Sequence, residues 1–357
     1  MKKSALIFAL IVGLLTSAST AMAQVNMSRY ITLTVTNGAA IKLDFAAASA
    51  GTPVRIVSGS NTQNLTVGPV WYNGNSPSTY TVTAGASTMT VYGDIIAFRC
   101  DNNGANLTAL DPSHHTELGL LSCYSNQLTS LDVSKNTQLM VLSCHSNQLT
   151  SLDVSKNTQL EMLWCRNNNL TTLDVSKNTE LDELNCANNK LNSLDVSKNT
   201  QLKKLYCYDN KFTTATLDDI YCALPDRTGK SYGRIQPVYN SSSSNLATVL
   251  ATNAANATAK NWKVQYYKNN SDITTTGSYD CSTAVAEAAA EPALTLYPNP
   301  VADVLYLSAT ARTIRVYDIY GTEVAHATDT DRVEVSHLPA GVYTVKADGT
   351  VAKMVKR

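Results

Sequence analysis

Charge is scarce in this 357-residue sequence, and neither sign prevails. Asp, Glu, Lys and Arg make up 16% of the chain, against roughly 25% in an average globular protein, and 28 basic residues balance 28 acidic ones. Because affinity for nucleic acid and for acidic membranes comes largely from concentrated Lys and Arg, this balance argues against both as partners. The 44% of hydrophobic residues nevertheless allow a substantial buried core.

Familiar catalytic patterns are also missing. We find no Ser-His-Asp, Cys-His or HExxH arrangement, P-loop or dinucleotide-binding glycine motif on a suitable strand and helix. His114 and His115, beside Asp111 and Glu117, resemble a metal or acid-base cluster. They occupy positions that Lys and Asn take in later repeats, so we expect them on an exposed convex turn. The sequence therefore predicts a protein that is not an enzyme and that uses no metal or cofactor.

A sustained apolar run occurs only at the N-terminus. Lys2 and Lys3 precede the run from Ala5 to Leu15, and small residues ending in Ala21-Met22-Ala23 follow. This order is typical of a signal peptide, here residues 1–23, and the run is too short to span a bilayer. No later stretch approaches about 18 continuous apolar residues, so we expect no transmembrane segment in the mature chain. Export places the cysteines in an oxidising compartment.

A period of 21 residues organises the middle of the chain. The block LDVSKNT begins at residues 131, 152, 173 and 194, and each copy follows a segment such as Leu139-x-x-Leu142-x-Cys144-x-x-Asn147-x-Leu149. This is the leucine-rich repeat pattern. We predict a β-rich solenoid of about six coils over residues 95–215, with a parallel sheet on one side and turns or single 3₁₀ turns on the convex side.

The cysteines divide into two groups. Six follow the period, and their strands would lie about 4.8 Å apart with parallel thiols, wider than the roughly 3.8 Å between disulfide-bonded Cβ atoms. We therefore expect a ladder of buried free thiols, formed by Cys100, Cys123, Cys144, Cys165, Cys186 and Cys207. Cys222 and Cys281 lie outside the period, and the sequence leaves open whether they form a disulfide or stay as two free thiols.

Asparagines follow the same period, and we expect them to form an inward ladder that bonds the backbone where each strand turns into its loop. The members of this ladder are Asn103, Asn126, Asn147, Asn168, Asn189 and Asn210.

Different patterns flank the repeats. Residues 24–94 alternate polar and apolar positions and predict a β-rich N-terminal cap. Residues 216–281 predict an α/β C-terminal cap, with a helix near 217–224, strands near 235–239 and 262–267, and a helical stretch between them. Residues 282–293 read as a linker, and residues 294–357 as a small Ig-like β-sandwich.

The C-terminal region resembles the sorting domain of type IX (Por) secretion cargo. The resemblance is carried by Tyr297-Pro298-Asn299-Pro300, by the segments VYDIYG at 316–321 and LPAGVY at 338–343, and by the basic end Lys356-Arg357. It implies the type IX secretion machinery as a partner, translocation across the outer membrane, and a cut in the 282–293 linker by a sortase-like peptidase. It also implies a location at the outer-membrane cell surface or outside the cell.

The repeats in turn resemble the cysteine-ladder branch of internalin-like leucine-rich proteins, over about a third of the chain. That family includes bacterial surface adhesins and invasion factors, so the resemblance implies a virulence-related role in attachment, with a protein ligand on a host or neighbouring cell.

The outward positions of the predicted sheet vary between repeats. Exposed Trp, Tyr, Met and Arg side chains are typical of protein-binding hot spots. The candidate site on this predicted concave face consists of Tyr124, His145, Met162, Trp164, Arg166, Tyr206 and Tyr208. We expect a non-enzymatic adhesion protein. The alternative is a glycan-binding or structural envelope module, in which the same rings stack on sugars.

Overall fold

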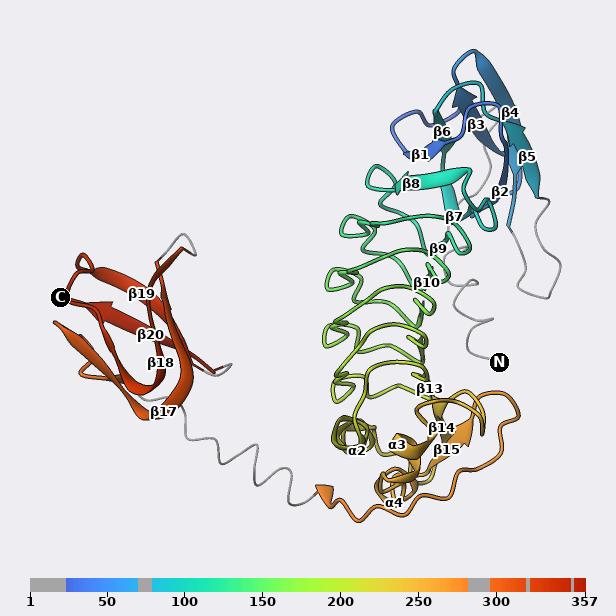
Figure 1. Cartoon of the computed structure of the whole chain (residues 1–357). Helices are drawn as coiled ribbons and strands as arrows, with labels where there is room; N and C mark the ends of the chain where they lie inside the picture. Colours follow the sequence, from blue (N-terminus) through green and yellow to red (C-terminus); the bar gives the residue numbers. More distant parts are fainter. Residues whose placement is uncertain (1–23, 70–78, 282–295, 319–321, 348–349) are drawn as a thin grey trace. The chain divides into compact units, whose positions relative to one another are not determined.

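The computed structural model describes residues 24–69, 79–281, 296–318, 322–347 and 350–357 (Figure 1). The signal peptide expected at 1–23 and the linker expected at 282–293 lie outside these residues. The chain divides into two compact units, Met1–Cys281 and Ser282–Arg357.

Short parallel strands of the first unit stack one repeat apart (Figure 1). They are β7 (Ile95–Arg99), β9 (Leu120–Ser122), β10 (Val141–Ser143), β11 (Met162–Trp164), β12 (Glu183–Asn185) and β13 (Lys204–Tyr206). Each strand pairs with the next in register, so that Leu142 lies beside Leu163, and both side chains are fully buried. The return path of each later coil consists of turns. The leucine-rich solenoid is thereby confirmed, including its turns on the side opposite the sheet.

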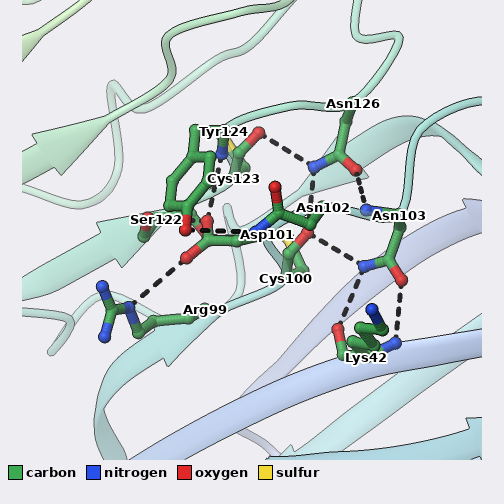
Figure 2. Close-up of polar contacts among 10 residues, drawn as sticks. All are labelled: Lys42, Arg99, Cys100, Asp101, Asn102, Asn103, Ser122, Cys123, Tyr124 and Asn126. Carbon is green, nitrogen blue, oxygen red and sulfur yellow. Dashed lines mark hydrogen bonds and ion pairs between the residues drawn. The ribbon is translucent and has the colours of Figure 1, made fainter. Parts of the chain in front are cut away.

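Figure 2 shows the first steps of the predicted asparagine ladder. The Asn126 Nδ2 atom donates to the carbonyl oxygens of Cys100 and Cys123, both at 2.9 Å, and its Oδ1 atom accepts from the Asn103 backbone at 3.0 Å. The later repeats use the same pair of donations, which satisfies carbonyls that would otherwise be buried without partners. This ladder is confirmed.

A second asparagine ladder, which we did not expect, runs along the turn side. Its members Asn136, Asn157, Asn178 and Asn199 are fully buried. Each reaches back to the preceding coil: the Asn157 Nδ2 atom donates to the carbonyl oxygens of Val133 at 2.9 Å and Asn136 at 2.8 Å. Polarity in a turn predicts exposure, but hydrogen bonds to the neighbouring coil hold these side chains inside.

The expectation for His115 was therefore wrong. His115 occupies the asparagine position of the first repeat and is fully buried, with its Nε2 atom 3.0 Å from the Gly93 carbonyl oxygen. Burial lowers the pKa of its imidazole. His114 is exposed, as expected, and stacks on Tyr30 with 4.3 Å between ring centroids.

The six periodic cysteines lie inside the coils as free, buried thiols. Burial raises the pKa of the Cys144 thiol to about 12, so it stays protonated at neutral pH. These side chains act as small apolar residues in the core.

Two β-layers close the N-terminal end of the repeats. Their strands are β1 (Tyr30–Val35), β2 (Ala40–Ala47), β3 (Thr52–Ser58), β4 (Asn61–Val67), β5 (Tyr80–Thr83) and β6 (Thr88–Gly93). Strand β2 pairs antiparallel with β7 and so continues the repeat sheet. The return path of the first repeat forms strand β8 (Leu107–Asp111), which pairs antiparallel with β1. The cap and the repeats share one continuous hydrophobic core.

The C-terminal cap extends the same sheet. It contains α2 (Thr214–Ala223), β14 (Gly233–Val238), α3 (Leu246–Leu250), α4 (Ala255–Thr258) and β15 (Trp262–Tyr266). Strand β14 pairs parallel with β13, and β15 parallel with β14. Helix α2 and strands β14 and β15 lie close to the expected ranges. That the two strands extend the repeat sheet was not predicted. Cys222 on α2 forms a disulfide with Cys281, which resolves the open question about this pair.

The second unit is an antiparallel sheet with its own hydrophobic core. Its strands are β16 (Leu296–Tyr297), β17 (Val304–Tyr317), β18 (Glu323–Glu334), β19 (Gly341–Ala347) and β20 (Thr350–Lys356). Strand β17 is continuous over its whole length and pairs antiparallel with both β18 and β19. Within the described residues, no helix combines the length and the apolar character needed to cross a membrane.

Candidate functional site

The candidate site lies on the outer sheet face, which we define as the side chains of the parallel strands that point away from the coil interior. On β10 and β11, for example, Ser143 lies beside Trp164, and the buried leucines lie between the outward positions. The register of the strands thus aligns outward residues in columns that run across the sheet, on the side where we expected the concave face.

The N-terminal part of this face is closed by its own packing. Ala46, Ala97 and Leu120, from three adjacent strands, are buried against one another, and Val141 packs on them. Met162 follows in the same column and is half-buried. This part of the column offers little open surface, and Met162 lies at its edge.

Asp101 is the centre of a polar network beside this apolar part (Figure 2). Its Oδ1 atom accepts hydrogen bonds from the Ser122 hydroxyl at 2.7 Å and the Tyr124 backbone at 3.1 Å, and its Oδ2 atom lies 3.4 Å from the Arg99 Nε atom. Burial raises the pKa of Asp101 to about 6, although the hydrogen bonds and Arg99 act in the opposite direction. Sequence reasoning did not single out Asp101, because a lone acidic residue at an outward position gives no signal.

Tyr124 and His145 form a stacked pair in the next two coils. Their ring centroids are 4.5 Å apart with 9° between the planes, and the Asn102 Nδ2 atom donates to the Tyr124 hydroxyl at 3.1 Å. Burial, and secondarily the charge of Arg166, lower the pKa of His145 to about 4. The imidazole is therefore neutral at physiological pH, and the pair presents an uncharged, half-buried aromatic surface.

Trp164 lies at the middle of the repeats and is held by a charged neighbour. Its Nε1 atom donates to the Glu183 Oε1 atom at 3.1 Å, and the other oxygen of Glu183 pairs with the Lys204 Nζ atom at 2.7 Å. The indole ring is half-buried, and so is Arg166 on the same repeat. Trp164 is thus fixed in orientation while part of its ring remains open to a partner.

Tyr208 differs from our expectation, because it is buried with only 5% of its surface exposed. The rings of Tyr239 and Tyr267 cover it, with centroids at 5.5 Å and 4.7 Å. Tyr206 is half-buried and meets Tyr267 edge to face at 5.7 Å. The covering rings come from the C-terminal cap, where no repeat signal pointed to them. Tyr208 therefore joins the repeats to the cap and does not face a partner.

Three cations lie side by side at the C-terminal end of the column that contains Met162 and Glu183. Lys204 on β13 lies beside Arg234 on β14, which lies beside Lys263 on β15. Sequence reasoning missed Arg234 and Lys263 because these strands lack the leucine-rich motif. The signal that could have found them is the alternation around the buried Ile235 and Val264.

The described side chains of this face are suited to non-covalent recognition. They offer aromatic surface, hydrogen-bonding groups and cations. The described part of the chain has no group of three or more His, Cys, Asp or Glu side chains placed to hold a metal ion.

Comparisons with known proteins support the C-terminal prediction. Residues 295–357 match the family described as "Secretion system C-terminal sorting domain", so the chain carries an address for export to the cell surface or medium by the type IX machinery. No curated protein matches the chain.

Among solved structures, the chain is similar to the functional domain of InlJ from Listeria monocytogenes, which includes a cysteine ladder, at 20% identity and a TM-score of 0.35, covering 74% of this chain and 67% of that one. An internalin, InlF, from the same organism is 21% identical with a TM-score of 0.35, covering 43% of this chain and 46% of that one. A leucine-rich repeat protein from Leptospira interrogans is 18% identical with a TM-score of 0.22, covering 31% and 42%. The chain thus spans about two thirds of the first structure and less than half of the other two.

Proposed function

We propose that this protein is a non-enzymatic surface adhesin that binds a protein on a host or neighbouring cell through its outer sheet face. The observation that carries the proposal is Trp164, which is held by Glu183 and partly open, with the half-buried Arg166 two residues further along the same coil. Trp and Arg are the residue types most enriched at binding hot spots. Neither side chain is needed by the coil, since other repeats place Ser, Asn or Ala at these two positions.

The stack of coils supports this role because it presents the face on a rigid support. Strands paired in register and two asparagine ladders hold the outward columns in place before any partner arrives. Binding to such a preorganised surface loses little conformational entropy. In the form that acts at the cell surface, we expect residues 24–281 to remain after both the signal peptide and the sorting domain are removed.

The proposal is tested by measuring binding of the exported protein to a panel of host matrix and epithelial proteins, together with a glycan array. The variant combines Trp164→Ala with Arg166→Ala, and its matched control combines Lys156→Ala with Lys177→Ala on exposed turns of the preceding coil and the same coil. Loss of a hot-spot pair should weaken binding by roughly 30-fold or more, whereas the control should bind like the parent protein. Tyr208 is left intact because the fold requires it.

Two results would contradict the proposal. The first is a folded Trp164 and Arg166 double variant, with a cooperative unfolding transition, that binds its protein ligand as the parent does. The second is binding to glycans alone, which would favour the sugar-binding alternative.

A further inference from the structure

We propose that the C-terminal end of the outer sheet face recognises an acidic segment of the protein partner. The cations that would bind it are Lys204, Arg234 and Lys263, which we call the cation row. This inference rests on the proposed function and adds the chemistry of the partner.

The strand register brings the cation row together. Lys204 and Arg234 are directly paired positions of β13 and β14, and Arg234 and Lys263 are paired positions of β14 and β15. Neighbouring strands lie about 4.8 Å apart, so the row spans roughly 10 Å at its base. That span suits two or more carboxylates of one short peptide segment.

The row holds more positive charge than the fold neutralises. Glu183 pairs with Lys204 at 2.7 Å, while nearby Asp182 pairs with Lys203 and so is already engaged. No carboxylate of the described residues lies within ion-pair distance of Arg234 or Lys263. In a chain whose formal net charge is zero, this leaves a local excess of two cations.

The guanidinium of Arg234 is not fully satisfied by the fold. Its Nε atom is buried and has no hydrogen-bond partner among the described residues. A buried donor without a partner is costly and calls for an explanation. The Lys263 ammonium instead lies 4.5 Å from the centroid of the Tyr232 ring, which positions it without neutralising it.

The neighbouring tyrosines favour a peptide over an acidic sugar. Sugars stack on open aromatic faces, but Tyr206, Tyr208 and Tyr267 cover one another and Lys263 covers a face of Tyr232. The exposed tyrosines here are Tyr232, at 47% and with Lys263 over its ring, and Tyr239, at 37% and packed against Tyr208 and Tyr267. Such groups contact irregular protein surface well.

The experiment measures binding of the full chain to a fluorescent peptide of alternating Glu and Tyr, to the same peptide with Gln in place of Glu, and to an oligogalacturonate. The variant combines Arg234→Gln with Lys263→Gln, and its control makes the same charge change at Lys156 and Lys177. The single variants Lys263→Gln and Arg234→Lys are included in case the double variant fails to fold.

We expect the acidic peptide to bind at least tenfold more tightly than the neutral one, and more weakly as salt is raised. The double variant should lose about tenfold in affinity for it and the control nothing, with Lys263→Gln intermediate and Arg234→Lys close to the parent protein. Equal binding of both peptides, parent-like binding by the folded variants, or tighter binding of the oligogalacturonate would overturn the inference.

Failure here is distinguishable from failure of the proposed function. If the variant at Trp164 and Arg166 abolishes binding of an identified protein partner and the cation-row variant does not, the binding face stands and the acidic-partner inference falls.

Discussion

Aspartates on the turn side and on the outer sheet face of the coils have pKa values shifted in opposite directions. On the turns, Asp132 accepts a hydrogen bond from the Ser134 backbone at 2.8 Å, and this bond lowers the pKa of its carboxyl group. On the sheet face, burial raises the pKa of Asp101 to about 6. The turn carboxylate stabilises its loop, whereas burial of the ionised sheet carboxylate lowers the stability of the fold. A charged residue that destabilises the fold is a better indicator of function than one that stabilises it.

The largest effect on stability is expected from the buried asparagine ladder on the turn side. Replacing Asn157 with Ala removes two hydrogen bonds that join adjacent coils and leaves the carbonyls of Val133 and Asn136 buried without those donors. We expect a loss of about 2–4 kcal/mol in the free energy of unfolding. The loss is reduced because the substitution also removes the buried Asn157 Oδ1 atom, which has no partner among the described residues. Urea denaturation measures the loss.

The matched control is Lys156→Ala, one residue away on the same turn and exposed. It should change the free energy of unfolding by less than about 0.5 kcal/mol. Equal effects of the two substitutions would show that the buried turn ladder contributes nothing special to the solenoid.

The second prediction contrasts the two carboxylates directly. The folded-state pKa of Asp101 lies above its unfolded value, so its stabilising contribution is complete below about pH 4 and is lost as the pH rises through 6. Asp101→Asn should therefore gain stability relative to the parent protein between pH 4 and pH 7, by up to about 3 kcal/mol, less whatever the pairing with Arg99 contributes.

Asp132→Asn should respond with the opposite sign. The pKa of Asp132 is lowered in the fold, so its contribution is present above the unfolded pKa and is lost as the pH falls. Melting temperatures of the parent and both variants between about pH 2.5 and pH 7 provide the measurement, because the contribution of Asp132 changes below about pH 4 and that of Asp101 above it. Parallel curves for all three proteins would contradict the contrast between the two faces.

The 21-residue period predicted the sheet and the inner asparagine ladder, but it did not predict contacts that come from outside the repeats. The positions of Leu142 and Asn126 followed from the repeat, because stacking forces equivalent residues into equivalent places. The burial of Tyr208 did not, because its covering rings, Tyr239 and Tyr267, belong to the cap. The cation row was missed for the same reason, since β14 and β15 continue the sheet without the motif.

The burial of the turn-side asparagines was not predicted, for a different reason. Polarity in a turn normally indicates exposure, and a single coil gives no hint that the next coil offers two carbonyl acceptors. The period was visible, but the direction of the side chain depends on a hydrogen-bonding partner 21 or 24 residues away. Only the stacked structure shows which polar positions point inward.

The smallest expected effect concerns His115, where the first repeat departs from the asparagine of the others. Burial is the main cause that lowers the pKa of this imidazole, and Arg29 adds to it, while Asp94 and the hydrogen bond to Gly93 oppose it. Because the folded-state pKa is depressed, the unfolded chain binds the proton more readily, and the contribution of His115 is lost as the pH falls below about 6.5.

His115→Asn restores the residue of the later coils and removes this sensitivity to pH. The variant should match the parent protein near pH 8 and unfold at a higher temperature than the parent near pH 5, as scanning calorimetry would show. A constant difference between the two proteins at all pH values would mean that His115 acts only through its shape.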